Sequence, residues 1–181
     1  STVICSDKTG TLTQNKMTVQ KIFVNRNIYD VSNLDENSDF IKYNSGNQEV
    51  KLVVYNGMLC NDTKIAEDGT LKGDPTETAL VDIALKLGFT EKIYEELPRV
   101  DEIPFDSDRK LMTTVHEREG RYIVYTKGGV DELLRRCTTY IENGEIKQDL
   151  GNYQSAIMDA NEKMAKDALR VLAFGYKELD H

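Results

Sequence analysis

The sequence predicts an α+β fold in which helices flank an antiparallel β-sheet. Two turns support this prediction, because Glu119-Gly120 and Asn143-Gly144 each lie between two segments with strand character, and Asn-Gly is a strong signal for a β-hairpin. Between the strands lie segments whose apolar residues recur at helical spacing. Helices interspersed with antiparallel hairpins favour α+β for the main body of the chain.

The first part of the chain is predicted to contain strands. Val3 to Ser6 is short and apolar, as in a buried strand, and Asp7 to Thr11 follows as a turn-rich loop. Residues 17–24 alternate like a strand, and residues 28–31 are their expected partner across a short turn. The polar composition of residues 32–49 predicts a loop.

Two helices are predicted in the middle of the chain. Residues 49–60 place apolar side chains at helical spacing. The second helix begins at Asp74, a capping residue, with Pro75 at its first position and Glu77 where a capping box has an acid. Gly88 is expected to end this helix.

The second half of the chain is predicted to mix strands and helices. The expected core residues of the last helix are Tyr153, Ile157, Met164 and Ala168. The predicted strands cover residues 100–103, 110–116, 121–125, 139–142, 146–147 and 171–176, and the predicted helices cover residues 131–137 and 152–168.

Composition limits the possible functions. The 181 residues fit one ordinary domain, or one domain with a fragment of a second, and 39% hydrophobic residues suffice for a core. No run of about 18 apolar residues occurs, so this chain is not expected to span a membrane itself, and its abrupt apolar start suggests a piece of a longer protein. The net charge of −8 argues against nucleic acid as a main partner. Three cysteines without a CxxC pair predict a reducing compartment and no disulfide framework.

Asp7 is the candidate catalytic nucleophile. A carboxylate at the end of a buried strand can attack a γ-phosphate and form an acyl phosphate. Thr9 and Thr11 offer contacts to phosphate or Mg²⁺, Gly10 lets the backbone approach, and Lys8 adds positive charge. A bare D-K-T-G favours a capped turn, whereas the seven-residue string D-K-T-G-T-L-T favours function.

That string is identical to the phosphorylation motif of P-type ATPases, and the chain resembles this family along most of its length. Because the matching blocks run from residue 3 to about residue 176 in the family's order, the joint signal is specific. The detailed sequence is most similar to the type II, calcium-pump-like branch. The other blocks are residues 72–80 (KGDPTETAL), 104–112 (PFDSDRKLM), 125–129 (YTKGG) and 169–173 (LRVLA).

The resemblance implies a site for ATP and Mg²⁺. It places the ring of Phe105 on adenine, Glu77 near the adenine amino group and Arg170 at the phosphates, with Asp7 and Thr9 on Mg²⁺. The nucleotide-binding residues that it implies are Glu77, Phe105, Lys110, Lys127, Gly128 and Arg170.

Each of these residues also has a purely structural interpretation. Phe105 is then a core residue at the start of a strand, Lys127 is a solvated loop lysine, and Glu77 closes the capping box. Arg109 and Lys110 are expected to alternate on a strand, so that only one faces the pocket, and the resemblance favours Lys110.

Two departures from the family pattern affect this site. The sarcoplasmic reticulum calcium pump has arginine at the position of Ser107, and the family's K-G-A-P-E pattern has proline at the position of Val130. There is no P-loop and no G-x-G-x-x-G sequence, so ATP is expected in a sheet pocket. The family's later acidic motifs, its actuator motif and its membrane helices do not occur in this chain.

The resemblance implies two parts. Residues 1–19 are interpreted as a stub of the phosphorylation domain with its hinge, and residues 20–177 as the nucleotide-binding domain. In the intact pump, this domain would deliver the γ-phosphate of ATP to Asp7, and the aspartyl phosphate would drive cation transport, for which the branch resemblance implies Ca²⁺. The expected partners are ATP and the phosphorylation, actuator and membrane domains of the same pump. The expected setting is a cytoplasmic domain of an integral membrane protein, and the isolated chain is expected to be a monomer that binds ATP without turnover.

Two alternatives stay open at this point. A haloacid-dehalogenase-type phosphohydrolase also uses an aspartate nucleophile, but it usually carries an acid two residues later, where this chain has Thr9. A regulatory or protein-interaction module could use the polar loop at residues 32–49 as a docking site.

Overall fold

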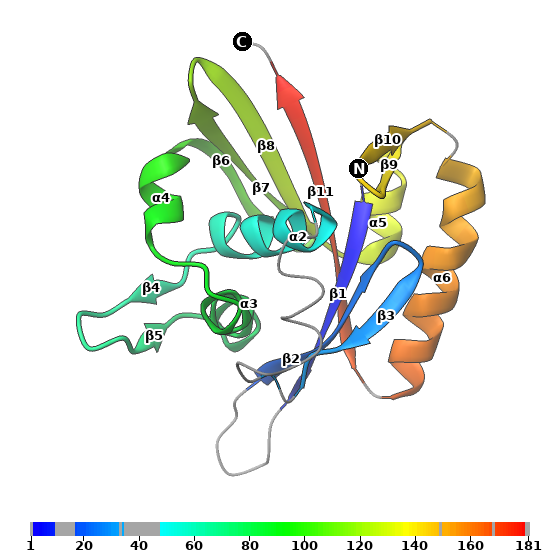
Figure 1. Ribbon diagram of the computed structural model, residues 1–181, viewed down its shortest axis with the longest axis horizontal. Coiled ribbons are helices and arrows are strands. Elements are labelled where there is room, and N and C mark those ends of the chain that lie inside the picture. The colour runs from blue at the N-terminus through cyan, green and yellow to red at the C-terminus, as the bar shows by residue number, and fades with distance from the viewer. Residues whose placement is uncertain are drawn as a thin grey trace.

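The computed structural model describes residues 2–9, 17–32, 34, 48–148, 150–167 and 169–179, with residues 2–9 and 152 as backbone only. Seven strands form one antiparallel sheet in the order β3-β2-β1-β11-β8-β7-β6 (Figure 1). The strands are β1 Thr2–Thr9, β2 Met17–Val24, β3 Asn27–Asp30, β6 Arg99–Asp106, β7 Leu111–Arg118, β8 Arg121–Gly128 and β11 Arg170–Leu179. Two small hairpins, β4 Lys64–Ile65 with β5 Leu71–Lys72 and β9 Tyr140–Glu142 with β10 Glu145–Lys147, lie outside this sheet.

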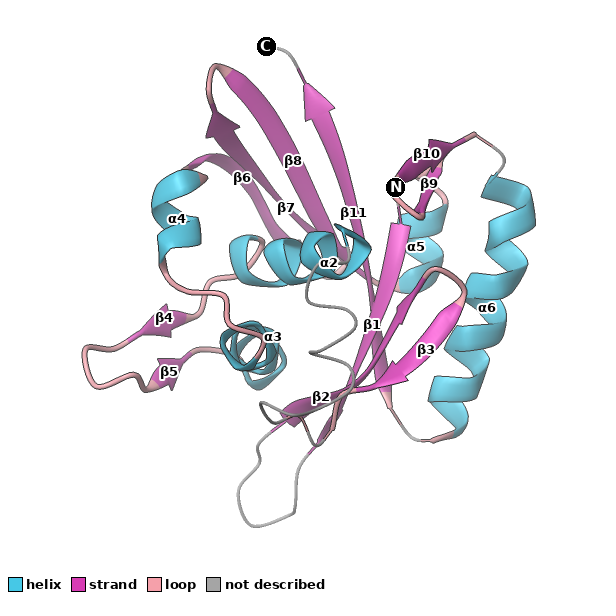
Figure 2. Ribbon diagram, viewed as in Figure 1, coloured by secondary structure: helices cyan, strands magenta, loops and turns pink. Residues whose placement is uncertain are grey.

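Helices lie on both faces of the sheet (Figure 2). The helices are α2 Gln48–Leu59, α3 Pro75–Lys86, α4 Lys92–Glu96, α5 Val130–Leu134 and α6 Leu150–Lys166. Among the described residues, none of these helices combines the length and the apolar character needed to cross a membrane. The architecture is α+β, which confirms the predicted fold class.

Alternation along the strands divides the core into two layers. Ile22 packs in the cluster with α2, α3 and α4, whereas the adjacent Phe23 packs in the cluster with α5 and α6. Phe174 and Ala173 in β11 divide in the same way. Successive strand residues point to opposite faces, so one sheet supplies both cores. A bulge in the pairing of β1 with β2 shifts the register between Lys21 and Val19, which lets Val19 join the first cluster.

The predicted hairpins are confirmed by their backbone angles. Asn143 and Gly144 have φ of 51° and 81°, and Glu119 and Gly120 have φ of 52° and 79°. Positive φ at both central residues matches the twist of the flanking antiparallel strands. The turn at Asn25 also has positive φ, 51°, and joins β2 to β3 as predicted.

The start of α3 also follows the prediction, except for Glu77. Asp74 caps the helix by accepting a hydrogen bond from Thr76 N at 2.9 Å, and Pro75 is the first helical residue. The carboxylate of Glu77, however, accepts hydrogen bonds from Asp62 N and Lys127 Nζ. Its predicted capping-box role is therefore wrong for this conformation, because a buried cation offers a stronger partner than a cap amide.

Several boundaries differ from those predicted. β1 continues to Thr9 where a loop is predicted from Asp7, since pairing with β2 and β11 extends the strand. Arg109 and Lys110 lie in the β6–β7 turn, with Lys110 at φ 60°, so the prediction that they alternate on a strand is wrong. Gln48, inside the predicted polar loop, already belongs to α2.

Other expectations stay untested. Ala168 and most of the predicted loop at 32–49 lie outside the described residues. The predicted domain boundary at residue 19 falls inside β2, and β1 is paired on both sides within the large sheet. The division into two parts remains a prediction.

Candidate functional site

A pocket of about 600 Å³ opens at the end of the sheet where α3 begins and β8 ends. The β6–β7 turn and the first residues of β11 supply the other walls. Its lining combines apolar, cationic and acidic side chains. The lining residues are Asp62, Asp74, Thr76, Glu77, Phe105, Ser107, Lys110, Met112, Lys127, Gly128, Gly129, Arg170, Val171 and Leu172.

The six predicted nucleotide-binding residues all line this pocket, although they span nearly a hundred positions of sequence. They are Glu77, Phe105, Lys110, Lys127, Gly128 and Arg170. Five of them lie on β6, β8 or β11 or in the β6–β7 turn, so sheet pairing brings them together, and only Glu77 lies on a helix. Whether they bind a ligand stays a prediction.

The predicted catalytic and metal residues lie on β1. Asp7 pairs with Arg170 of β11 and with Val19 of β2, and Thr9 pairs with Met17. The backbone of Asp7 thus lies beside a strand that lines the pocket. The side chains of Asp7 and Thr9 lie outside the described atoms, so their roles stay predictions. Within the described part of the chain, no group of three or more histidine, cysteine, aspartate or glutamate residues could hold a metal ion.

Lys127 and Glu77 form the polar centre of the pocket. Lys127 Nζ lies 2.6 Å from Glu77 Oε2 and also donates a hydrogen bond to the carbonyl oxygen of Cys60. Only 7% of Lys127 is exposed, so this residue is not the solvated loop lysine of the structural interpretation. A buried ammonium needs both charge and hydrogen-bond partners, and the 59–62 segment and α3 supply them.

Gly128 is required by a close approach between β8 and the β6–β7 turn. A Cβ atom on Gly128 would overlap the carbonyl oxygen of Lys110 and would lie 2.6 Å from Leu111 Cδ2. Gly129 N donates a hydrogen bond of 3.3 Å to the same Lys110 carbonyl oxygen. The glycine therefore lets the turn lie directly against β8 and fixes that wall of the pocket.

Phe105 presents an exposed aromatic ring at the pocket. It is 63% exposed on β6, an edge strand, so its interpretation as a core residue is wrong. A large exposed aromatic side chain in a concave site offers a face for stacking a planar ligand. Lys110 and Ser107 line the pocket from the adjoining turn, and Lys110 Nζ lies 3.7 Å from Glu132 Oε1.

Arg170 is held at the opposite wall by Thr76. Arg170 Nη1 donates a hydrogen bond of 3.0 Å to Thr76 Oγ1, and that hydroxyl in turn lies 3.3 Å from Met17 Sδ. This chain of contacts ties the start of β11 to the first turn of α3 and to β2. These contacts hold the Arg170 guanidinium at the pocket, where the predicted contact with phosphates would require it.

The residues behind the pocket are kept neutral by burial. Burial raises the pKa of the Cys60 thiol, although the nearby Lys127 ammonium opposes this shift. Burial also lowers the pKa of His116, which lies at the far end of β7. Cys60 is therefore a protonated thiol at neutral pH, and its contribution to the pocket is its carbonyl oxygen.

The comparison with known proteins identifies the family. A family model described as P-type ATPase, cytoplasmic domain N, matches residues 49–181. The chain belongs to the P-type ATPase family. It is 43% identical, over 98% of its length, to calcium-transporting ATPase 1 of Bacillus cereus, and 38% identical, also over 98%, to calcium-transporting ATPase 1 of Lactococcus lactis. It is 40% identical, over 99% of its length, to a calcium-transporting ATPase of Listeria monocytogenes.

The chain covers only a part of these P-type ATPases. It spans 19% of the Bacillus cereus and Lactococcus lactis proteins and 20% of the Listeria monocytogenes protein. The predicted family is confirmed, and the chain is a fragment of a P-type ATPase. All the described residues that line the pocket lie within residues 49–181, the part that matches domain N.

Sequence reasoning missed several residues of the P-type ATPase pocket. Asp62 and Thr76 line it, and the Cys60 carbonyl oxygen holds Lys127. One sequence feature could have indicated this role for the segment. The sequence C-N-D at residues 60–62 follows a helical pattern directly, and the end of a helix leaves carbonyl groups free to accept hydrogen bonds. The β4–β5 hairpin beside this segment gave no signal, since its strands have only two residues each.

Proposed function

We propose that this chain is the ATP-binding domain of a cation-transporting P-type ATPase and that the pocket described above binds the nucleotide. The observation that carries the proposal is the convergence of Glu77, Phe105, Lys110, Lys127, Gly128 and Arg170 on one cavity. The volume of this cavity, about 600 Å³, lies in the range of small-molecule sites.

The residues present suit an adenine nucleotide. Phe105 offers an exposed ring face to a base. Gly128 lets the β6–β7 turn lie against β8, which a Cβ atom at this position would prevent. Lys110 and Arg170 bring positive charge to the walls of the cavity, as phosphate groups require. Glu77 is an acceptor for the amino group of adenine.

In the intact pump, Asp7 would take the γ-phosphate, and the aspartyl phosphate would drive transport of a cation. Mg²⁺ would be held by Asp7 and Thr9 and would offset negative charge on the phosphates. The rest of the same polypeptide would supply the phosphorylation, actuator and membrane domains, and the domain described here would face the cytoplasm. Calcium is the proposed cation, because the relatives named above are calcium-transporting ATPases.

The test is an ATP titration of the 181-residue chain, followed by ¹H–¹⁵N NMR. We expect a compact set of shifted peaks, and weaker binding in Phe105→Ala and Lys127→Ala. Ile146→Ala is the matched control, because Ile146 is 60% exposed and does not line the pocket. No shift at millimolar ATP would overturn the proposal.

A second measurement addresses turnover. We expect no steady ATP hydrolysis by this chain, in either the wild type or Asp7→Asn. Hydrolysis that disappears in Asp7→Asn would instead favour an enzyme that is complete within these residues.

A further inference from the structure

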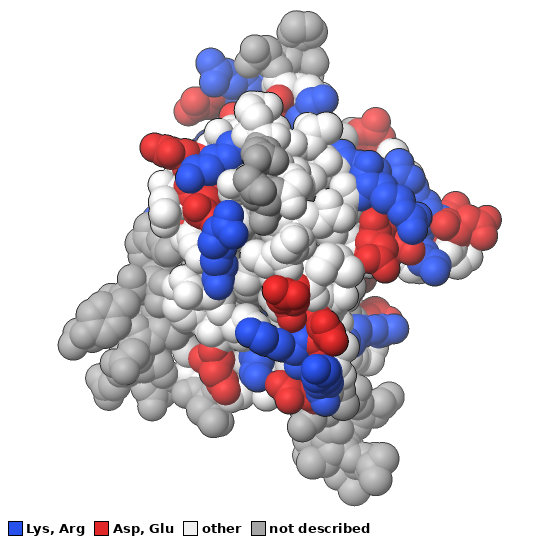
Figure 3. All heavy atoms as spheres, turned by 90° about the vertical axis from the view of Figure 1, so that its right-hand side faces the viewer, with Lys and Arg blue, Asp and Glu red and all other residues white. Residues whose placement is uncertain are grey.

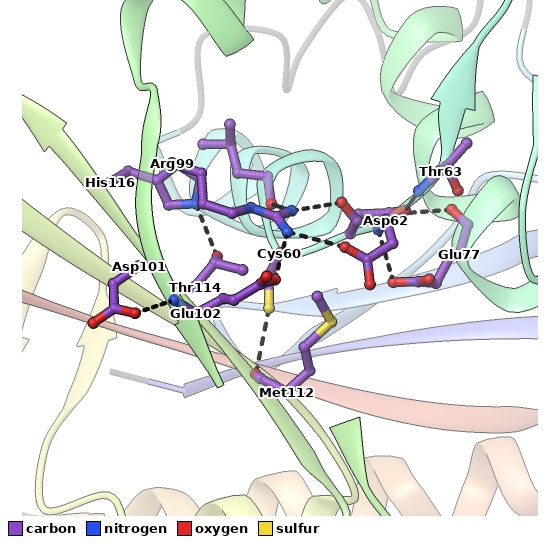
Figure 4. A network of polar contacts seen from close by, with 12 residues as sticks. Cys60, Asp62, Thr63, Glu77, Arg99, Asp101, Glu102, Met112, Thr114 and His116 are labelled. Carbon is purple, nitrogen blue, oxygen red and sulfur yellow. Dashed lines mark hydrogen bonds and ion pairs between the residues drawn. The ribbon is translucent and has the colours of Figure 1, made fainter. Parts of the chain in front are cut away.

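The guanidinium of Arg99 binds the segment that follows α2. Arg99 is the first residue of β6, and its Nη2 donates hydrogen bonds to the carbonyl oxygens of Leu59 at 2.9 Å and Asn61 at 2.7 Å. Its Nη1 lies 2.9 Å from Asp62 Oδ1 and 3.0 Å from Glu102 Oε2. Figure 4 shows the side chain of Arg99 directed at Asp62. The last carbonyl groups of a helix lack partners within it, and Arg99 satisfies that of Leu59, the last residue of α2, together with the carbonyl group of Asn61 just beyond the helix.

The same segment holds the polar centre of the pocket from its other side. The Cys60 carbonyl oxygen accepts a hydrogen bond from Lys127 Nζ, and Asp62 N donates one of 3.2 Å to Glu77 Oε2. Asn61 Nδ2 donates a hydrogen bond of 2.8 Å to the Glu77 carbonyl oxygen. The carbonyl groups of residues 59 and 61 thus bind Arg99, while that of residue 60 binds Lys127.

Arg99 also offsets negative charge at the pocket. The described lining has three carboxylates, Asp62, Asp74 and Glu77, and three cations, Lys110, Lys127 and Arg170. Such a balanced lining gives little net attraction for a polyanion. Arg99 is not one of the lining residues, but its pairing with Asp62 adds a fourth cation beside them.

We infer that Arg99 is a positioning residue for the nucleotide pocket, which it shapes through the 59–62 segment without contacting the ligand. This inference rests on the proposed function. Without Arg99, two carbonyl groups lose their donor, and the Asp62 carboxylate at the pocket loses its cation. The hydrogen bond that Lys127 Nζ donates to the Cys60 carbonyl oxygen and the one that Asp62 N donates to Glu77 then lose their fixed geometry.

Lysine cannot replace arginine in this role. The planar guanidinium reaches the carbonyl groups with one nitrogen and the carboxylates with the other, whereas an ammonium is a single point of charge. Arg99→Lys keeps the charge near Asp62 and loses the fork. Comparing Arg99→Lys with Arg99→Gln separates the contribution of the positive charge from that of the forked hydrogen bonds.

The experiment is the ATP titration of the 181-residue chain in wild type, Arg99→Lys, Arg99→Gln and the control Arg118→Gln. Arg118 is an exposed arginine at the end of β7, so its substitution causes the same loss of charge away from the pocket. We expect ATP affinity to fall about tenfold in Arg99→Gln and about threefold in Arg99→Lys. In Arg118→Gln it should change by less than about twofold.

Two readouts distinguish positioning from a general loss of structure. The Lys127 side-chain ¹⁵Nζ signal and the Asp62 amide signal should move in Arg99→Gln before ATP is added. Adding Asp62→Asn to Arg99→Gln should recover about half of the lost affinity on a logarithmic scale, because it removes the unpaired carboxylate. Arg99→Lys carries the test if Arg99→Gln does not fold.

The outcomes separate this inference from the proposed function. If the wild type binds ATP and both Arg99 variants bind it equally well, the positioning role is wrong and the proposed function stands. If the wild type does not bind ATP, the proposed function fails and the positioning role fails with it. Weaker binding in the Arg99 variants, with the Lys127 and Asp62 signals shifted, supports both.

Discussion

The two faces of the sheet are covered by helices in different ways. On the face of α2, α3 and α4, buried polar groups cross between elements: Asn56 donates to Thr126 O and Gly175 O, and Lys127 reaches Glu77. On the face of α5 and α6, the contacts are mainly apolar and aromatic, with the rings of Tyr140 and Tyr153 stacked at 4.3 Å. The pocket lies at the edge of the polar face.

On the α6 side, the described residues carry charges of both signs on the outer surface. In Figure 3, lysine, arginine, aspartate and glutamate side chains are interspersed around a largely uncharged area. Its clearest ion pair, between Arg26 and Glu142 at 2.7 Å, joins the β2–β3 turn to β9. The cation of this pair lies over the Tyr153 ring, 5.0 Å from its centroid, so this pair fastens two hairpins. The Lys127–Glu77 pair instead lines a cavity. Chemically similar ion pairs thus have different roles because of what surrounds them.

The largest expected effect separates stability from binding. Ile157 lies on α6 and is fully buried, so Ile157→Ala should lower the free energy of unfolding by about 2–5 kcal/mol. Because α6 lies away from the pocket, the ATP affinity of the folded fraction should change by less than about twofold. Urea unfolding and an ATP titration measure the two quantities, with the exposed Gln154→Ala of the same helix as control. A large loss of affinity in folded Ile157→Ala would show that the two faces are coupled.

The second prediction moves to the pocket wall. In Gly128→Ala the new Cβ meets the Lys110 carbonyl oxygen and Leu111, and overpacking of this kind costs about 1–3 kcal/mol of unfolding free energy. ATP affinity should also fall, because the β6–β7 turn that carries Lys110 must move. Gly57→Ala is the control, since Gly57 lies on α2, does not line the pocket, and its Cβ would make only an ordinary contact with Leu80 Cβ at 3.5 Å. Equal effects in the two variants would argue against a special role for Gly128.

Much of the fold was accessible from the sequence because its signals are local. The strand over residues 17–24 and the turns at Glu119-Gly120 and Asn143-Gly144 are confirmed, since side-chain alternation and positive φ are set within a few residues. The β6–β7 turn was misjudged, because the basic residues Arg109 and Lys110 resemble a strand continuing into β7. The turn is revealed by the positive φ of Lys110 and by the hydrogen bonds that Asp106 accepts from Lys110 N and Asp108 N.

The site was only partly accessible, and for a physical reason. Motifs named Glu77 and Lys127 separately, but their contact joins residues fifty positions apart and follows from how α3 packs against the sheet. The roles of Arg99 and the Cys60 carbonyl oxygen depend on where a helix ends relative to an edge strand. No local pattern encodes such an arrangement.

The third prediction concerns the contact that holds Arg170. Thr76→Val keeps the side-chain shape but removes the hydroxyl that accepts the hydrogen bond from Arg170, which should cost about 1 kcal/mol of unfolding free energy. ATP affinity should fall about threefold, because the guanidinium is no longer fixed at the pocket. Thr78→Val serves as the control, since the Thr78 hydroxyl bonds only to the Pro75 carbonyl oxygen within its own helix. Unchanged affinity in Thr76→Val would place the ligand away from Arg170.

The smallest expected effect is a pH dependence on the polar face. His116 is 1% exposed, with Nδ1 at 2.8 Å from Leu97 O and Nε2 at 2.8 Å from Thr114 Oγ1. Since the carbonyl oxygen can only accept, Nδ1 carries the proton, and neutral Nε2 accepts from the Thr114 hydroxyl. Burial lowers the pKa of His116 below its usual 6.5, and the nearby Arg99 guanidinium lowers it further, while the Leu97 carbonyl oxygen opposes the shift.

The sign of the dependence follows from proton binding. Below pH 6.5 the unfolded chain protonates this histidine while the folded protein does not. The free energy of unfolding is therefore complete above pH 6.5 and falls as the pH drops toward the lower pKa of the folded state. In His116→Gln this part of the pH dependence disappears. The free energy of unfolding, measured with urea at several values between pH 5 and pH 7.5, should therefore change less with pH than in the wild type. Carboxylate titration is common to both proteins, so it cancels when the unfolding free energy of the variant is subtracted from that of the wild type. If the two plots of unfolding free energy against pH are parallel, His116 becomes protonated without cost, and the polar face tolerates a buried charge at this position.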